Sequence, residues 1–460
     1  MKYKMGVPGW RITVFSGLKK RTKQGVQHLL CTAIDPVSAK LDSLEEARDS
    51  LRLEGRLAWL ESEAGRARRA ALLSCELQGF EHSLRDCSGK RILVAGWYGA
   101  DNLGDELMMR SVLEHLPEEA LRRTAVLLWD NPTYDRLNVD ARVHPIHYPA
   151  TTRELDSIVD YFDVVIWGGG AILDDGQFND DVNNFNTGNL FIRINELMIA
   201  RGKDVYCLGL SANEAISNSV YIKHLRNVIA HARHFSLRDP RSKEVLVEKG
   251  IPSDQLAECD DLVFALRELG DGVCATNDNA FVLGFVFLHA WELLDTYVNV
   301  VKACVEEASA RAEGRDVRAL LIPFMNEGHY DEGMNGALGE RLSTAGINVE
   351  LAEYSPKVAD SAILRCDALV SYKYHSALIS CCYGIPCLLV SRGEHPHYAN
   401  KMHHLANLAG IGGMCVGSGE FEADPTELAK RLFADSAVPR IDPSVYKRAT
   451  EDLGAICIGL

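Results

Sequence analysis

A chain of 460 residues with 47% hydrophobic and 25% charged residues has the composition of a globular protein with two or three domains. Its net charge of −15 argues against general nucleic-acid binding, because contacts to phosphates need a basic surface. The 13 cysteines form no CxxC pairs, which is typical of reduced, buried thiols rather than of a disulfide framework. No apolar run is long enough to span a bilayer and no signal peptide is visible, so we expect a cytoplasmic protein.

The first 88 residues divide into a basic segment and a helical one. Residues 1–34 carry seven lysines and arginines and no acid. We therefore interpret residues 1–40 as a mobile or partner-docked tail, with a surface helix attracted to anionic lipid at the inner face of the membrane as the weaker alternative. In residues 41–88, leucines and alanines recur at helical spacing among many charges. This pattern predicts one or two amphipathic helices that pack on the fold or mediate homo-oligomerisation.

From residue 89 onward, short β-branched runs alternate with helical stretches, which is the pattern of parallel βαβ units. The predicted fold class is α/β, with two doubly wound Rossmann-like lobes, an N-terminal helical extension and a cleft faced by the carboxyl ends of the strands. The expected strands of the first lobe, residues 89–267, are 91–96, 124–129, 142–147, 163–167, 204–209 and 233–237. Those of the second lobe, residues 276–415, are 281–287, 318–323, 347–351, 367–371 and 386–391, and a helical segment at 416–460 follows.

The turn at 99–106 has the sequence Gly-Ala-Asp-Asn-Leu-Gly-Asp-Glu and leads from a buried strand into a helix. Backbone amides at a helix start favour an anionic ligand, and glycines let the main chain approach it. No Gly-Lys-Ser/Thr follows, so the turn is not a Walker loop. We predict a substrate contact here, made by Asn102, Gly104, Asp105 and Glu106.

Three consecutive glycines, Gly168, Gly169 and Gly170, follow the apolar run at 163–167. Glycine loses much conformational entropy on folding, so a plain loop rarely needs three in a row. We interpret them as a place where the backbone approaches the substrate closely. Asp174, which follows, would bind sugar hydroxyls or cap the next segment.

A third motif lies at the end of the sixth expected strand. Arg238 at this position can hold a carboxylate or a phosphate by two parallel hydrogen bonds. Asp239, directly before Pro240, has the place of a helix N-cap. We predict ligand binding for Arg238 and a cap for Asp239. For Asp260 and Asp261 two interpretations stay open: the side chains line the cleft, or they stabilise a turn.

The second lobe contributes a turn that carries Lys373 and His375 between a strand and a helix. A histidine at such a place can act as a general acid or base near neutral pH, and the nearby lysine favours this interpretation. Lys401 follows the next strand and would reach the same pocket. His395 and His397 lack a third ligand of suitable spacing, so we predict no metal site.

In this order, the motifs resemble those of the polysaccharide pyruvyltransferases, over roughly residues 91–415. The matching elements are Gly-x-x-Asn-x-Gly-Asp-Glu at 99–106, Gly-Gly-Gly at 168–170, Arg-Asp-x-x-Ser at 238–242 and a variant of Ser-x-Arg-x-His-Ala at 371–376. The resemblance implies the two-lobed glycosyltransferase B fold. It also implies an enzyme that moves the enolpyruvyl group of phosphoenolpyruvate onto a sugar of a cell-surface polysaccharide or its lipid-linked precursor, forming a pyruvate ketal.

The same resemblance implies roles for three side chains. Arg238 would grip the phosphoenolpyruvate anion, His375 would serve as acid and base, and Lys401 would add a second positive contact. Protonation of the donor's methylene carbon leaves an oxocarbenium-like centre, which two neighbouring sugar hydroxyls attack in turn. No cofactor is expected beyond the donor substrate.

The chain departs from the family pattern at three positions. Lys373 stands where the family has arginine, so bidentate recognition of the donor carboxylate would be lost. Ser376 stands where it has alanine, and the bulky Trp97 opens the first Gly-rich turn.

Two other functions stay open. A nucleotide-sugar-dependent glycosyltransferase would need an acid that grips the donor ribose, for which Glu394 is the candidate. A catalytically silent scaffold would bind a partner through residues 41–84, and Lys373 in place of arginine keeps this alternative open.

Overall fold

A computed structural model describes residues 63–84, 88–129, 142–176, 178, 186–267, 269, 280–325, 330–354, 362–391, 396–434 and 438–457. The predicted tail at 1–40, residues 41–62 of the helical segment, and Glu394 lie outside the described residues. The chain divides into two compact units, Met1–Arg68 and Arg69–Leu460, and both sheets belong to the second unit. Of the helices that can be described, none is both long and apolar enough to cross a bilayer.

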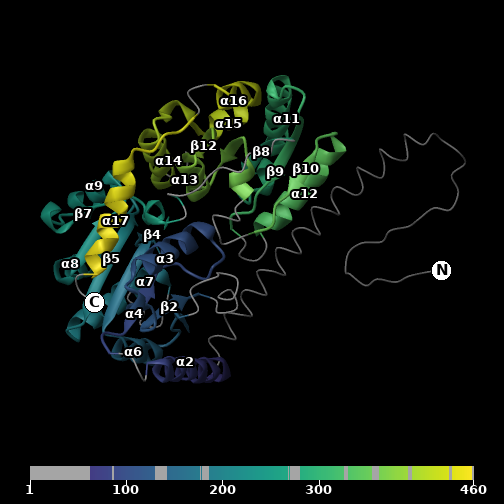
Figure 1. Ribbon diagram of the computed structural model, residues 1–460. Coiled ribbons are helices and arrows are strands. Elements are labelled where there is room, and N and C mark those ends of the chain that lie inside the picture. The colour runs from purple at the N-terminus through teal and green to yellow at the C-terminus, as the bar shows by residue number, and fades with distance from the viewer. Residues whose placement is uncertain are drawn as a thin grey trace, which may run out of the picture. The chain divides into compact units, whose positions relative to one another are not determined.

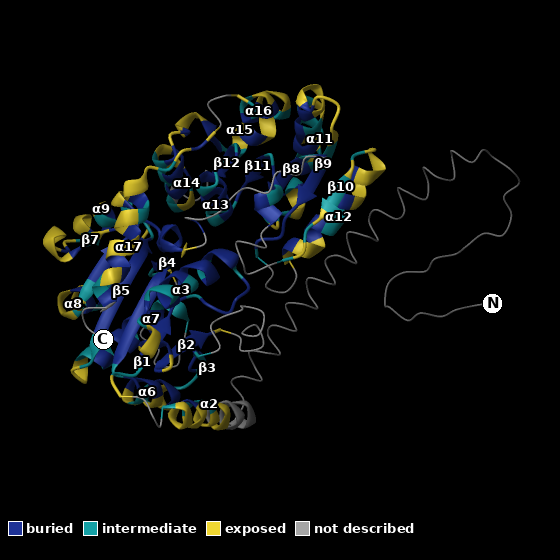
Figure 2. Ribbon diagram, viewed as in Figure 1, coloured by how far each residue is buried: buried dark blue, intermediate teal, exposed yellow. Residues whose placement is uncertain are grey.

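The first sheet has seven parallel strands in the order β3-β2-β1-β4-β5-β6-β7. The strands are β1 (Ile92–Ala95), β2 (Thr124–Leu128), β3 (His144–His147), β4 (Val164–Leu173), β5 (Asp204–Ala212), β6 (His234–Leu237) and β7 (Ala257–Glu258). In β1, Ile92 and Val94 pack into one core while Leu93 and Ala95 pack into another. Both faces of the sheet are therefore buried, which explains why its strands read as unbroken apolar runs (Figure 2).

The helices of this lobe cover both faces of the sheet (Figure 1). They are α3 (Leu103–His115), α4 (Glu118–Leu121), α6 (Thr152–Tyr161), α7 (Thr187–Ala200), α8 (Ser219–His231), α9 (Pro240–Glu248) and the 3-10 turns η2 (Ser253–Gln255) and η3 (Leu262–Ala265). Helix α2 (Glu63–Ser83) comes from the predicted helical segment. Its Phe80 is fully buried, with its ring centroid 5.6 Å from that of Phe162. This end of the segment is therefore part of the first-lobe core.

The second sheet has six parallel strands in the order β10-β9-β8-β11-β12-β13. They are β8 (Ala280–Val286), β9 (Asp316–Leu321), β10 (Val349–Leu351), β11 (Ala368–Ser371), β12 (Cys387–Ser391) and β13 (Cys415–Gly417). The helices are α11 (Leu294–Arg311), α12 (Tyr330–Thr344), α13 (Tyr374–Cys382), α14 (Pro396–Leu408), α15 (Ser418–Ala423) and α16 (Pro425–Leu432), with 3-10 turns η4 (Trp291–Leu293), η6 (Ala362–Arg365) and η7 (Gly412–Met414).

Helix α17 (Pro443–Cys457) follows the second lobe but packs along the first sheet (Figure 1). Arg448 donates a hydrogen bond to Asp260 at 2.6 Å. Asp452 accepts one from the hydroxyl of Ser236 at 2.6 Å and lies 2.6 Å from His234. Helix α17 therefore connects the second lobe to the first through hydrogen bonds.

The predicted α/β class with two parallel sheets is confirmed. The predicted end of the strand at 163–167 was wrong, because β4 continues through the three glycines to Leu173. Gly169 and Gly170 have φ of +78° and +100°, and the pairing with β5 shifts register between Gly170 and Leu173. The strand can therefore bend without ending. The edge strands β7 and β13 were not predicted, because two or three residues carry no readable alternation.

Candidate active site

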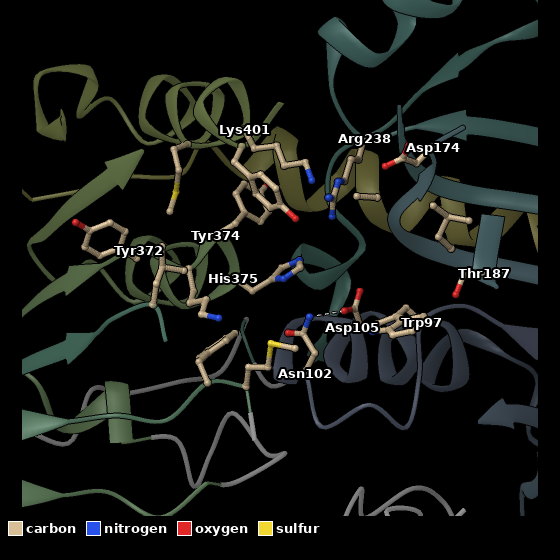
Figure 3. A pocket seen from close by; sticks show the side chains of 18 of the residues that line it. Trp97, Asn102, Asp105, Asp174, Thr187, Arg238, Tyr372, Tyr374, His375 and Lys401 are labelled. Atoms are coloured by element: carbon tan, nitrogen blue, oxygen red, sulfur yellow. Dashed lines mark hydrogen bonds between the residues drawn. The ribbon is translucent and has the colours of Figure 1, made fainter. Parts of the chain in front are cut away.

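A cavity of about 610 Å³ lies at the carboxyl ends of the strands of both sheets, and residues of both lobes line it (Figure 3). Seven of the residues predicted for the site line this cavity: Asn102, Asp105, Asp174, Arg238, Lys373, His375 and Lys401. The nitrogen ends of Arg238, His375 and Lys401 point into the same space (Figure 3). Residues from distant parts of the chain thus meet at one point, as the parallel-strand pattern predicted.

Arg238 follows β6, and its side chain is only 4% exposed. Its Nη1 donates a hydrogen bond to Oδ2 of Asp261 at 2.7 Å, and its guanidinium lies 5.4 Å from the ring centroid of Tyr374. Its Nε meets no hydrogen-bond acceptor among the described residues. A buried donor without an acceptor is costly. Asp239 caps α9 by accepting from Ser242 N at 2.7 Å, which confirms its predicted role.

Asp261, which the sequence left open, belongs to the site. Besides Arg238, the same Oδ2 lies 3.3 Å from Nε2 of His375, and the carboxylate is fully buried. Burial alone would raise its pKa, but His375 and Arg238 together hold the pKa of Asp261 well below the usual range. Asp261 is therefore ionised at neutral pH, and its carboxylate contacts one candidate residue from each lobe.

Asp105 lies in the first turn of α3, where it accepts a hydrogen bond from Nδ2 of Asn102 at 2.6 Å. Burial raises the pKa of Asp105 to about 6, although the positive charges of His375, Arg238 and Lys401 work in the opposite direction. This carboxyl group therefore changes its charge near neutral pH, within the cavity.

Lys401 lies on α14, and only 7% of the residue is exposed. Its Nζ lies 5.2 Å from the ring centroid of Tyr398. Burial, and next the neighbouring Arg238, lower the pKa of Lys401 well below the usual range for lysine. An anion in the cavity would restore the charge of this side chain.

Gly104 does not line the cavity, but it permits the contact between α3 and His375. A Cβ at this position would collide with Nδ1 of His375. Glu106, also predicted as a substrate contact, is fully buried and accepts a hydrogen bond from Gly99 N at 2.8 Å. Burial raises the pKa of Glu106 well above the usual range. The geometry gives Glu106 a structural place inside the turn rather than a contact with the cavity.

The three glycines of β4 also lie outside the cavity lining. A Cβ at Gly168 would lie 2.6 Å from Cγ2 of Val112, and one at Gly169 would collide with Sδ of Met108. Both of these neighbours belong to α3. Gly168 and Gly169 therefore let α3 pack closely on β4, which gives these two positions a reason for glycine other than the predicted approach to a substrate.

Lys373 and Ser376 hold the turn of the second lobe together. Lys373 is the N-cap residue of α13, and its backbone N–H donates to Oγ of Ser371 at 3.1 Å. Oγ of Ser376 lies 2.6 Å from the same hydroxyl. The serine at the family's alanine position is thus accommodated by a hydrogen bond. Sequence reasoning missed Tyr374 as a cavity residue, because no pattern separates it from the core.

No group of three or more His, Cys, Asp and Glu side chains that could hold a metal is found in the described part of the chain. His395, one of the two histidines considered for zinc, lies outside that part.

A family model described as polysaccharide pyruvyl transferase matches residues 102–394. No curated protein matches the chain. Among solved structures, UDP-GlcNAc 2-epimerase from Methanocaldococcus jannaschii gives a TM-score of 0.51 at 12% identity, over 80% of this chain and 100% of that one. Anabaena Alr3699/HepE in complex with UDP and glucose gives 0.47 at 10% identity, over 80% and 95%. The first of these confirms the predicted glycosyltransferase B fold. Because the family match spans more than half of its residues, the chain belongs to the polysaccharide pyruvyl transferase family, a family of transferases.

Proposed function

We propose that this transferase uses phosphoenolpyruvate as donor and forms a pyruvate ketal on a sugar of a cell-surface polysaccharide or its lipid-linked precursor. One observation carries the proposal: Arg238, His375 and Lys401 line a single cavity. Phosphoenolpyruvate carries a carboxylate and a phosphate, and an arginine and a lysine are the usual partners of such groups. The guanidinium of Arg238 and the amino group of Lys401, two residues that line the cavity, supply these contacts.

His375 has the place of the general acid in this proposal. It gives a proton to the methylene carbon of the donor, and the electrons of the C–C double bond form the new C–H bond. A sugar hydroxyl oxygen then bonds to the cationic neighbouring carbon and loses its proton to His375. The bond from that carbon to the phosphate oxygen breaks, and its electron pair leaves with phosphate. A second hydroxyl closes the ketal, and its proton accompanies the phosphate.

The proposal also covers the cofactor, the acceptor, the cellular location and the oligomeric state. The site needs no cofactor besides the donor, and a glycan is the acceptor. We propose a cytoplasmic protein whose basic residues 1–34 contact the inner face of the membrane, where lipid-linked precursors are found, and which forms a homo-oligomer.

The test is a reaction of the protein with phosphoenolpyruvate and a panel of glycans in D₂O. We expect phosphate release together with deuterium in the methyl group of the ketal. His375→Ala should abolish both, while His403→Ala on the exposed side of α14 should leave both unchanged.

Phosphate release no greater than that of His375→Ala, across the whole panel, would contradict the proposal. So would thermal stabilisation by a nucleotide sugar but not by phosphoenolpyruvate, which would favour the glycosyltransferase alternative.

A further inference from the structure

Three aromatic residues stand at the carboxyl ends of three neighbouring strands. Trp97 follows β1, Trp129 follows β2, and Tyr148 follows β3. The ring centroids of Trp97 and Trp129 are 4.9 Å apart, and those of Trp129 and Tyr148 are 5.8 Å apart. Backbone N–H of Trp129 donates to the carbonyl of Tyr98 at 2.8 Å, and the hydroxyl of Tyr148 donates to the carbonyl of Gly96. The rings therefore form a row on fixed backbone.

Trp129, the middle residue of this row, is the most exposed of the three. Tyr148 is 4% exposed, Trp97 is half-buried, and Trp129 is 44% exposed. An exposed indole needs no special explanation by itself, but Trp129 lies against Trp97, which lines the cavity. A large exposed aromatic beside a cavity is typical of a binding surface.

The row joins the cavity through Trp97, which lines it. On the same wall lie Asp105, Asp174 and Thr187 (Figure 3). This wall thus combines a flat apolar surface with carboxyl and hydroxyl groups. A pyranose ring needs both, because its faces carry C–H groups and its edge carries hydroxyls. The C–H groups are weakly positive and are attracted to the negative face of an aromatic ring.

We propose that Trp97 and Trp129 form the subsite for pyranose rings of the acceptor glycan. Trp97 contacts the sugar that receives the pyruvyl group, and Trp129 contacts the next sugar outward. The proposal rests on the proposed function for its acceptor class. It concerns this chain in particular, because the bulky Trp97 departs from the family pattern.

The test measures glycan binding and donor binding separately on the full-length protein. The probes are gluco-, galacto- and manno-configured disaccharides, titrated without donor and followed by saturation-transfer NMR and indole fluorescence. We expect Trp129→Ala to weaken binding of the best disaccharide, and to raise its KM, by about tenfold, since one aromatic contact has this order of magnitude. Phosphoenolpyruvate binding should not change, and Trp129→Phe should restore part of the loss.

Trp291→Ala is the matched control, because Trp291 is 48% exposed but its ring lies against His289, whereas that of Trp129 lies against the cavity residue Trp97. It should leave disaccharide binding unchanged. Wild-type disaccharide affinity in both Trp129→Ala and Trp97→Ala would overturn the proposal, and so would equal losses of donor and disaccharide binding. If no disaccharide binds the wild-type protein, the subsite is also refuted.

The failure of the subsite can be told from the failure of the proposed function. Disaccharide binding that depends on Trp129, without phosphate release from phosphoenolpyruvate, refutes the reaction and supports the subsite. Phosphate release that is insensitive to both tryptophans refutes the subsite and supports the reaction.

Discussion

Asp261 of the first lobe lies 3.3 Å from His375 of the second, measured from Oδ2 to Nε2. The same oxygen accepts the hydrogen bond of Arg238. One buried carboxylate thus holds both the proposed acid and the proposed anion-binding group. Since Asp261 does not line the cavity, it acts through these two side chains and is a positioning residue.

Replacing Asp261 by Asn should therefore lower kcat strongly and change KM for phosphoenolpyruvate less. Correct placement of a general acid accounts for about 10²-fold or more in rate, so we expect a loss of that order. The buried Arg238 also loses its counter-charge, which should cost about 3 kcal/mol of unfolding free energy, measured by urea denaturation. Asp260→Asn is the control, because Asp260 contacts Arg448 outside the cavity. Wild-type kcat in Asp261→Asn would contradict the positioning role.

Donor affinity should fall as pH rises through about 6. In the empty site the pKa of Asp105 is raised to about 6, and that of Lys401 is lowered well below the usual range. A bound anion favours the protonated form of both groups, so binding takes up protons and weakens when protons become scarce. Titration calorimetry in buffers of different ionisation enthalpy measures this uptake.

The donor phosphate itself titrates near pH 6, so a variant is needed to separate the two effects. Asp105→Asn should flatten the pH dependence, while Asp174→Asn, in the same cavity, should preserve it. Equal pH dependence in the wild-type protein and Asp105→Asn would show that the carboxyl group of Asp105 is not involved.

Lys373→Arg should tighten phosphoenolpyruvate binding. Lys373 lines the cavity, and it is the N-cap residue of α13, where its backbone N–H donates to Oγ of Ser371. A guanidinium can bind a carboxylate through two parallel hydrogen bonds, and an ammonium cannot. We therefore expect KM to fall several-fold, which corresponds to about 1 kcal/mol of binding free energy. Lys373→Met should raise KM instead. Unchanged KM in both variants would mean that this position does not contact the donor.

Sequence reasoning found the meeting of Arg238, His375 and Lys401 because parallel strands place their carboxyl ends at one edge. It could not decide on Asp261, because this carboxylate and His375 are 114 positions apart in the chain. It also assigned Glu106 to the substrate, since a motif does not show which acid of a turn faces inward. Three glycines in β4 signal a close approach of some group, but only the packing shows that helix α3 is what approaches at Gly168 and Gly169.

Gly104→Ala should impair the reaction. A methyl group here would collide with Nδ1 of His375 and displace the imidazole. A displacement of about 1 Å can cost about 10²-fold in rate, so we expect a decrease in kcat of that order. Gly336→Ala on α12 is the control, because a Cβ there meets nothing within 4 Å. If both variants keep wild-type kcat, the position of His375 does not depend on this approach.

Gly169→Ala should lower the unfolding free energy by more than the cost of placing an alanine at positive φ. At φ of +78° an alanine costs about 1–2 kcal/mol, and its methyl group would in addition collide with Met108 of α3. Gly202 provides the comparison, since its φ is +69° and a Cβ there meets nothing within 4 Å. We therefore expect Gly202→Ala to show the backbone cost alone, and Gly169→Ala to lower the unfolding free energy further, as measured by urea denaturation. Equal losses in the two variants would mean that the contact between α3 and β4 relaxes freely, and that backbone conformation alone requires glycine at this place.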